Sequence, residues 1–76
     1  MKIMAVRIEG WRDVPNFEGI YWINIKGIVK NSKDQIITPR DHNGIEMVEL
    51  YGNGQRELIP ISTLVLDAFP EIYKED

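Results

Sequence analysis

Asp41-His42-Asn43-Gly44 contains the residue types with which a metal-dependent nuclease cleaves a phosphodiester bond. In such a site, a histidine acts as general base and oxygen or nitrogen side chains hold a divalent metal. Adjacent residues in one loop cannot supply that geometry, and Asp, Asn and Gly together are typical of a turn. His42 is the single histidine and the chain has no cysteine, so a structural zinc cluster is also excluded. We therefore predict a solvated turn, no metal and no cofactor.

The other patterns that indicate catalysis are missing too. Ser32 and Ser62 lack a second histidine that could activate either hydroxyl as a nucleophile. Glu46 and Glu49 are three positions apart in a predicted strand, an odd spacing, so their carboxylates lie on opposite faces and cannot act as a pair. The sequence predicts that the chain is not an enzyme.

Binding is the remaining kind of function, and charge limits what the partner can be. The formal net charge is -3 and the pI is about 5.0, whereas most free-standing DNA binders are basic. Residues 26–40 nevertheless carry four basic residues and one acidic residue, a net +3, while the rest of the chain carries five basic and eleven acidic residues, a net -6. This segment fits a weak nucleic-acid contact, a protein partner or a solvated charged face.

The candidate nucleic-acid-binding residues come from this segment and from the strand before it. A two-stranded ribbon can enter a DNA groove or lie along the phosphates. Trp22 lies on the opposite strand face from Tyr21, where it is either an exposed stacking anchor or is covered by Trp11 and the N-terminal loop. The candidates are Lys26, Lys30, Lys33, Arg40 and Trp22.

Length and composition predict one small domain over residues 1–76. Hydrophobic residues make up 43% of the chain and the charges are mixed, which argues against disorder. The apolar run after Lys2, from Ile3 to Val6, is too short for a signal peptide or a membrane span. We expect a soluble cytoplasmic protein.

The N-terminal half of the sequence predicts a strand, a loop and a hairpin. Residues 2–8 read as a short strand, and the glycines and proline of residues 9–19 predict a loop whose Trp11 and Phe17 fold back onto the core. Strict alternation begins at Ile20, so residues 20–31 are predicted to form a β-hairpin with a tight turn at Lys26-Gly27.

The C-terminal half predicts a second hairpin and a helix. In order, we expect a short strand at 36–38 ended by Pro39, a polar loop at 40–44, a strand at 45–51, an Asn53-Gly54 turn and a returning strand at 56–61. Ser62 is the predicted N-cap of a helix over residues 63–69, in which Leu64 and Ala68 share one apolar face; residues 70–76 form a tail. The predicted fold class is α+β: a small antiparallel sheet of two hairpins closed by one short C-terminal helix.

One stretch is similar to a known family. Trp11-Arg12-Asp13-Val14-Pro15-Asn16-Phe17-Glu18-Gly19-Ile20-Tyr21 resembles the opening of the nuclease-associated modular domains of the NUMOD group, fourth type. Members typically read Trp-x-x-Ile-Pro-Gly-Tyr-Glu-Gly-x-Tyr-x-Val-Ser-Asn-x-Gly-Arg-Val. A second block, residues 43–69, resembles the stretch that joins such a module to an HNH nuclease. The resemblance implies a phage-derived, non-catalytic module that binds double-stranded DNA.

Two departures separate this sequence from the family pattern. The family Ser-Asn-x-Gly-Arg becomes Asn24-Ile25-Lys26-Gly27-Ile28, so its Asn and Arg are replaced. In the second block, Ser62 and Thr63 stand where the family has His and Arg, and the metal-binding segment that should follow does not occur before Asp76. We expect no HNH cleavage.

Three hypotheses therefore stand side by side. In the first, the chain is a DNA-binding module that uses the basic hairpin. In the second, it is a small acidic phage-type accessory protein that binds and modulates a host or phage protein as an inhibitor or DNA mimic. In the third, it is a decayed nuclease fragment. The match around Trp11 favours DNA, whereas the net charge favours a protein partner.

Overall fold

The computed structural model describes residues 10–73, and the predicted strand at residues 2–8 lies outside this range. Within residues 10–73, six strands precede one α-helix and a 3-10 helix. The elements are β1 (Arg12–Asp13), β2 (Tyr21–Ile23), β3 (Val29–Asn31), β4 (Arg40–His42), β5 (Ile45–Gly52), β6 (Gln55–Pro60), α1 (Ile61–Ala68) and η1 (Pro70–Tyr73). Neither of these helices is long and apolar enough to cross a membrane.

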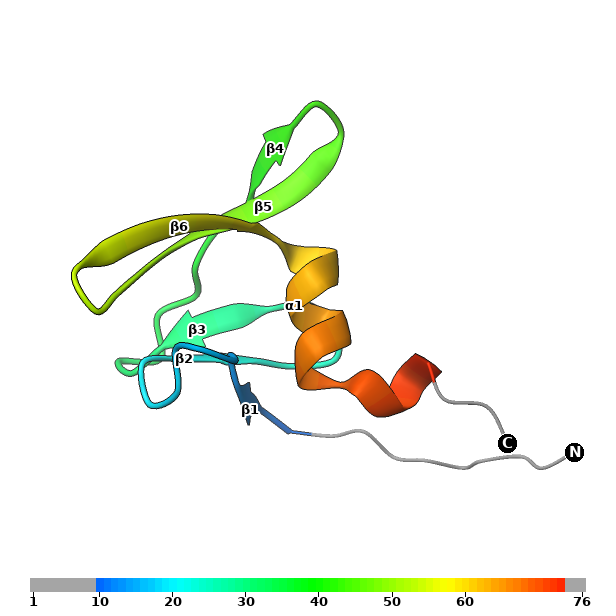
Figure 1. Ribbon diagram of the computed structural model, residues 1–76, viewed down its shortest axis with the longest axis horizontal. Coiled ribbons are helices and arrows are strands. Elements are labelled where there is room, and N and C mark those ends of the chain that lie inside the picture. Colours follow the sequence, from blue (N-terminus) through cyan, green and yellow to red (C-terminus); the bar gives the residue numbers. More distant parts are fainter. Residues whose placement is uncertain (1–9, 74–76) are drawn as a thin grey trace, which may run out of the picture.

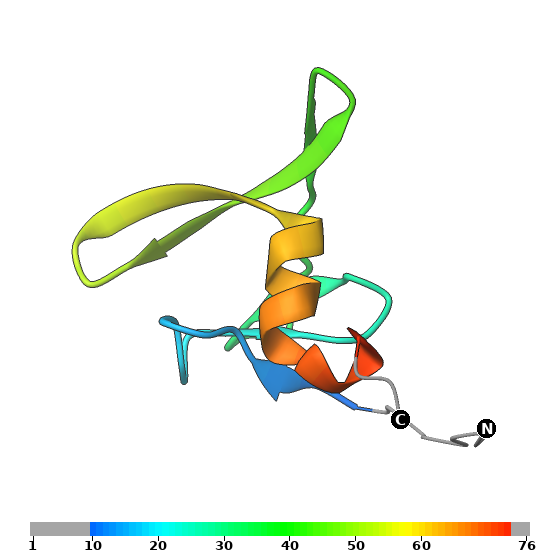
Figure 2. The same cartoon turned by 45° about the vertical axis from the view of Figure 1, so that its right-hand side comes forward.

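The strands form two antiparallel sheets, in the orders β1-β2-β3 and β4-β5-β6. Figures 1 and 2 show one sheet above the other, with α1 running from the end of β6 in the upper sheet down beside the lower sheet. The helix contacts β2 of the first sheet and β5 and β6 of the second. The predicted α+β class, with antiparallel strands and a C-terminal helix, is confirmed, and the strands divide over two sheets.

One apolar cluster holds both sheets and the helix together. Trp22 lies on the opposite face of β2 from Tyr21, as predicted; Tyr21 and Ile23 are buried in the core, and Trp22 is half-buried. Leu64 and Ala68 form the buried face of α1, also as predicted. The largest fully buried side chains are Phe69, Ile23, Leu50, Val14, Val29 and Val48.

The segment between β1 and β2 joins the two sheets directly. The ring of Phe17 is buried and meets Tyr21 edge to face, with ring centres 5.8 Å apart. The backbone N–H of Tyr51 in β5 donates to the Tyr21 hydroxyl at 3.1 Å. A Cβ atom added at Gly52 would lie 3.0 Å from the Phe17 ring, so this glycine allows the close approach. The prediction that Phe17 folds back onto the core is confirmed.

The first residues of the predicted loop 9–19 include a short strand. Arg12 and Asp13 form β1 and pair with Ile23 and Trp22. The strand is only two residues long and lacks apolar alternation, so no periodic signal marks it. Its pairing arises because a compact turn, in which Phe17 N–H donates to the Val14 carbonyl at 2.9 Å, folds the chain back along β2.

Arg12 also attaches the C-terminal segment to the first sheet. Its guanidinium donates to the Ala68 carbonyl at 2.9 Å, forms an ion pair with Glu71 of η1 and lies 4.4 Å from the centre of the Phe69 ring. Hydrogen bonding to Glu71 raises the pKa of Arg12. Residues 70–73 of the predicted tail are thus folded against the domain as η1.

An additional hairpin, β4–β5, replaces the predicted polar loop at residues 40–44. Arg40–His42 is strand β4, and Asn43 and Gly44 are the turn, both with positive φ. Two-residue turns of this kind suit antiparallel strands because their twist matches that of the strands. Every residue of β4 is exposed, which explains why no hydrophobic alternation reveals it.

Two further predictions, the N-cap of the helix and the strand at 36–38, are corrected by the structure. Helix α1 begins at Ile61 directly after β6, with Pro60 as N-cap and no side-chain capping hydrogen bond, so the predicted cap at Ser62 is wrong. Proline fits there because its φ of -63° is compatible with the helix start. The predicted strand at 36–38 is reduced to a single bridge between Ile36 and Lys30.

Glycine at position 27 is expected to be required for packing as well as for backbone conformation. Gly27 and Gly44 both have positive φ, but a Cβ atom at Gly27 would lie 2.9 Å from Ile61 Cγ2, whereas one at Gly44 meets nothing within 4 Å. Gly44→Ala should lower the free energy of unfolding by ~1–2 kcal/mol because of the positive φ. Gly27→Ala should have the same cost from its φ and, in addition, lose ~1–3 kcal/mol because the new methyl group overpacks against Ile61. Urea denaturation followed by circular dichroism measures both; equal losses would contradict the packing contact.

Candidate nucleic-acid interface

The turn between β2 and β3 is organised by one asparagine. The Asn24 side-chain oxygen accepts hydrogen bonds from the backbone N–H groups of Lys26 and Ile28, each at 3.0 Å. Gly27, with φ of 84°, completes the turn. The predicted hairpin is confirmed, although the alternation ends at Ile23 and Ile25 lies in the turn. Lys26 is exposed at the turn.

The turn after β3 repeats this arrangement. The Asn31 side-chain oxygen accepts from the N–H groups of Lys33 and Gln35 at 2.9 and 3.0 Å, and Asp34, with φ of 62°, takes the position that Gly27 has in the first turn. Two equivalent turns therefore present Lys26 and Lys33 at opposite ends of β3. This relation was not predicted, although Asn-x-Lys recurs after seven residues and indicates it.

The outward face of the first sheet lies between these two lysines. Strand register places Asp13, Trp22 and Lys30 side by side across β1, β2 and β3. The neighbouring row contains the buried Ile23 and Val29, so this row faces away from the core. Trp22 and Lys30 are thus brought together, with Lys26 and Lys33 at either end. Arg40 is in β4 of the second sheet and is not part of this face.

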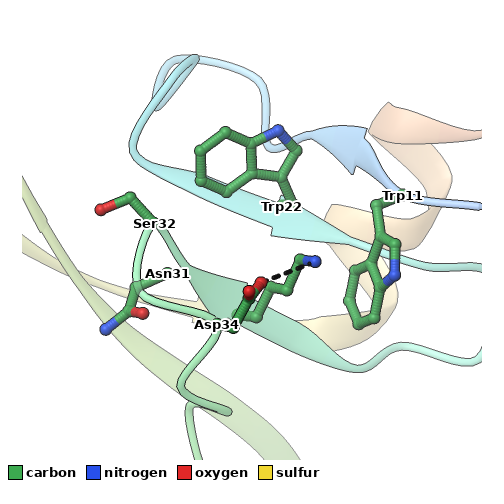
Figure 3. A pocket seen from close by; sticks show the side chains of 6 residues that line it. Trp11, Trp22, Asn31, Ser32 and Asp34 are labelled. Atoms are coloured by element: carbon green, nitrogen blue, oxygen red, sulfur yellow. Dashed lines mark ion pairs between the residues drawn. The ribbon is translucent and has the colours of Figure 1, made fainter.

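A shallow pocket of about 420 Å³ opens on this face. Figure 3 shows the two indole rings on two sides of it, with Ser32 and Asp34 on the turn that follows β3. The Lys30 ammonium lies 4.4 Å from the centre of the Trp11 ring. The predicted position of Trp11 on the core is wrong: the residue is 39% exposed and borders this pocket.

Lys30 is held by two partners at once. Besides the contact with Trp11, its ammonium pairs with the Asp34 carboxylate at 3.0 Å, the dashed line in Figure 3. The Lys30 side chain is 23% exposed, whereas that of Asp34 is 80% exposed. The carboxylate is therefore easily hydrated, and an incoming anion can replace it without leaving a buried charge unpaired. The arrangement offers two aromatic surfaces and a cation to a planar or anionic ligand.

The residues Asp41-His42-Asn43-Gly44 do not form a catalytic or metal site in the described part of the chain. His42 is the last residue of β4, is exposed and pairs across the hairpin with Ile45. The Asp41 carboxylate accepts from the Gly44 N–H at 3.4 Å, which belongs to the turn. Between residues 10 and 73, no three His, Cys, Asp or Glu side chains gather as a metal site would require.

Comparison with known proteins identifies a similar fold. The structure resembles that of the HNH homing endonuclease I-HmuI, which binds and cleaves DNA, with a TM-score of 0.73 and 22% sequence identity. The match covers 80% of this chain and 36% of the endonuclease, so this chain spans about a third of that protein. No family model matches the sequence, and no curated protein matches it either. At this identity the similarity establishes a shared fold with an HNH-type endonuclease.

The contacts of Lys30 predict that it contributes to stability and that Lys33 does not. Lys30→Met removes both the ring contact and the ion pair, and should lower the free energy of unfolding by ~1 kcal/mol. Lys33→Met is the matched control, because the turn uses only the backbone N–H of Lys33. Urea denaturation compares them; a similar loss in both variants would show that the ring contact has no energetic role.

Proposed function

We propose that this chain is a DNA-binding module of the NUMOD type that holds duplex DNA against the outward face of sheet β1-β2-β3 and does not cleave it. The observation that carries this proposal is the fold shared with an endonuclease described as binding and cleaving DNA. The resemblance of Trp11–Tyr21 to the opening of NUMOD modules agrees with it.

The two lysine-bearing turns are the proposed phosphate contacts. Lys26 and Lys33 are exposed at opposite ends of β3, so a DNA backbone that follows this strand meets both. Lys30 lies between them and becomes a third contact once a phosphate replaces the Asp34 carboxylate. Trp22 provides apolar contact surface beside Lys30. Phosphate contacts of this kind position a protein without reading the sequence.

Affinity is expected to be modest and dependent on salt. The chain carries a net charge of -3, and hydrophobic residues replace the family Asn and Arg at Ile25 and Ile28. Few cations remain to neutralise phosphates, and each neutralised phosphate releases a condensed counterion. Such a module suits attachment to another binding element, where proximity raises its effective concentration.

Salt titration of duplex binding tests the proposed contacts. Fluorescence anisotropy with a labelled duplex should show affinity that falls steeply with salt, and Lys26→Gln or Lys33→Gln should each reduce the slope of log K against log salt by about 1. Arg56→Gln is the matched control, since it also removes one positive charge but from the β5–β6 hairpin, where Arg56 pairs with Glu49. An equal effect of all three variants would indicate only a net-charge effect, and no binding at low salt would exclude the proposal.

The non-catalytic part of the proposal has its own experiment. Supercoiled plasmid incubated with the purified protein and Mg²⁺ or Mn²⁺ should stay intact, because His42 is the only histidine and lies beside a turn. The control is a preparation of His42→Ala. Nicking by the wild-type protein that this variant loses would show that the chain is a nuclease.

Binding to another protein is a second candidate, and the second sheet favours it. Ile45, Tyr51 and Leu58 are exposed on one face of β5 and β6, opposite the buried Val48 and Leu50. Exposed apolar side chains gathered on one face are typical of interaction surfaces. The duplex titration separates the two candidates, because a protein-binding role requires no affinity for phosphates.

A further inference from the structure

Both tryptophans of the chain border the same pocket, and the proposed backbone contacts make little use of it. Trp11 lies just before β1 and Trp22 lies in β2, so the arrangement depends on the pairing of these strands. Phosphate binding along β3 requires the lysines but not an opening between two indole rings. The pocket is therefore suited to a ligand that has an aromatic or planar surface of its own.

The charges already present in the pocket select the class of that ligand. The Lys30 ammonium already fills the cation position of the pocket, since it is 4.4 Å from the Trp11 ring centre and 3.0 Å from the Asp34 carboxylate. A second cation, such as an arginine or lysine of a partner protein, would meet repulsion from Lys30. A planar ring that carries an anionic group finds indole surface and ammonium together once that anion has displaced the exposed Asp34 carboxylate from Lys30.

Nucleotides have this combination of properties. A base stacks on aromatic side chains whatever its identity, because every base has a π-face. The phosphate of the same nucleotide can replace Asp34 at Lys30, and the carboxylate then turns into solvent, to which it is already largely exposed. Paired bases inside a duplex have both faces covered by their neighbours, so only a base that has left the stack can enter.

We propose that the pocket between Trp11 and Trp22 binds one unpaired base of a DNA strand, with the base stacked on Trp22 and its phosphate at Lys30. This inference rests on the proposed function and deepens it, because it distinguishes the form of DNA that is held most tightly. The preferred site is DNA with an extrahelical or unpaired nucleotide next to a duplex segment that contacts Lys26 and Lys33.

The tryptophans themselves report on the pocket. The chain has no tryptophan besides these two, so its indole emission comes entirely from the proposed site. A fully paired duplex and the same duplex with one extrahelical thymidine serve as probes, and anisotropy gives the affinity of each. The bulged duplex should quench the emission and bind about tenfold more tightly, within the range measured for stacking of one base.

Variants separate stacking from folding. Trp22→Leu keeps an apolar side chain beside Lys30 but has no ring, so it should lower the ratio of bulged-duplex to paired-duplex affinity to about one, whatever its effect on paired-duplex binding. Trp22→Phe should retain part of the preference because its ring still stacks. Circular dichroism checks that each variant is folded. Equal affinities of the wild-type protein for both duplexes, without quenching, would overturn the base pocket yet leave duplex binding in place. Failure to bind either duplex at low salt would overturn the proposed function and the pocket together.

Discussion

The apolar cluster shared by α1 and the two sheets is the constraint on which the rest of the structure depends. Three-stranded sheets with strands this short need packing on one face, and a helix of eight residues is marginal in water. Ile23 and Val29 enter the cluster from the first sheet, Val48 and Leu50 enter from the second, and Phe69 closes it. Because all of the inward faces are used in this way, the outward faces of both sheets remain open to ligands.

The residues that carry the family resemblance mostly serve this constraint. Phe17 and Tyr21 connect the two sheets, and Gly19 has the positive φ that the turn between β1 and β2 requires. Among the aromatic residues of that stretch, Trp11 alone lies at the pocket rather than in the core. The motif therefore identifies the fold, whereas the charge and the ring contacts of the outward face determine what the fold can hold.

Prediction from the sequence succeeded where side-chain periodicity was strong. Alternation predicted β2, with Tyr21 and Trp22 on opposite faces, and Asn53-Gly54 predicted the hairpin turn between β5 and β6. It failed at β1 and β4, whose short, polar strands bury nothing that would produce a periodic signal. At the candidate site, Trp22 and Lys30 were both named in advance. Their adjacency follows from strand register, and the inclusion of Trp11 follows from the pairing of β1 with β2.

The fold class and the turns that asparagine and glycine impose could be predicted from the sequence alone, because these depend on residues close together in the chain. That Trp11, Trp22, Lys30 and Asp34 share one pocket, and that Arg40 lies outside it, is known only from the way the elements pack. Strand pairing and side-chain contacts between separate elements arise from the packing of the whole core. No local pattern encodes which partner a lysine or an indole ring will meet.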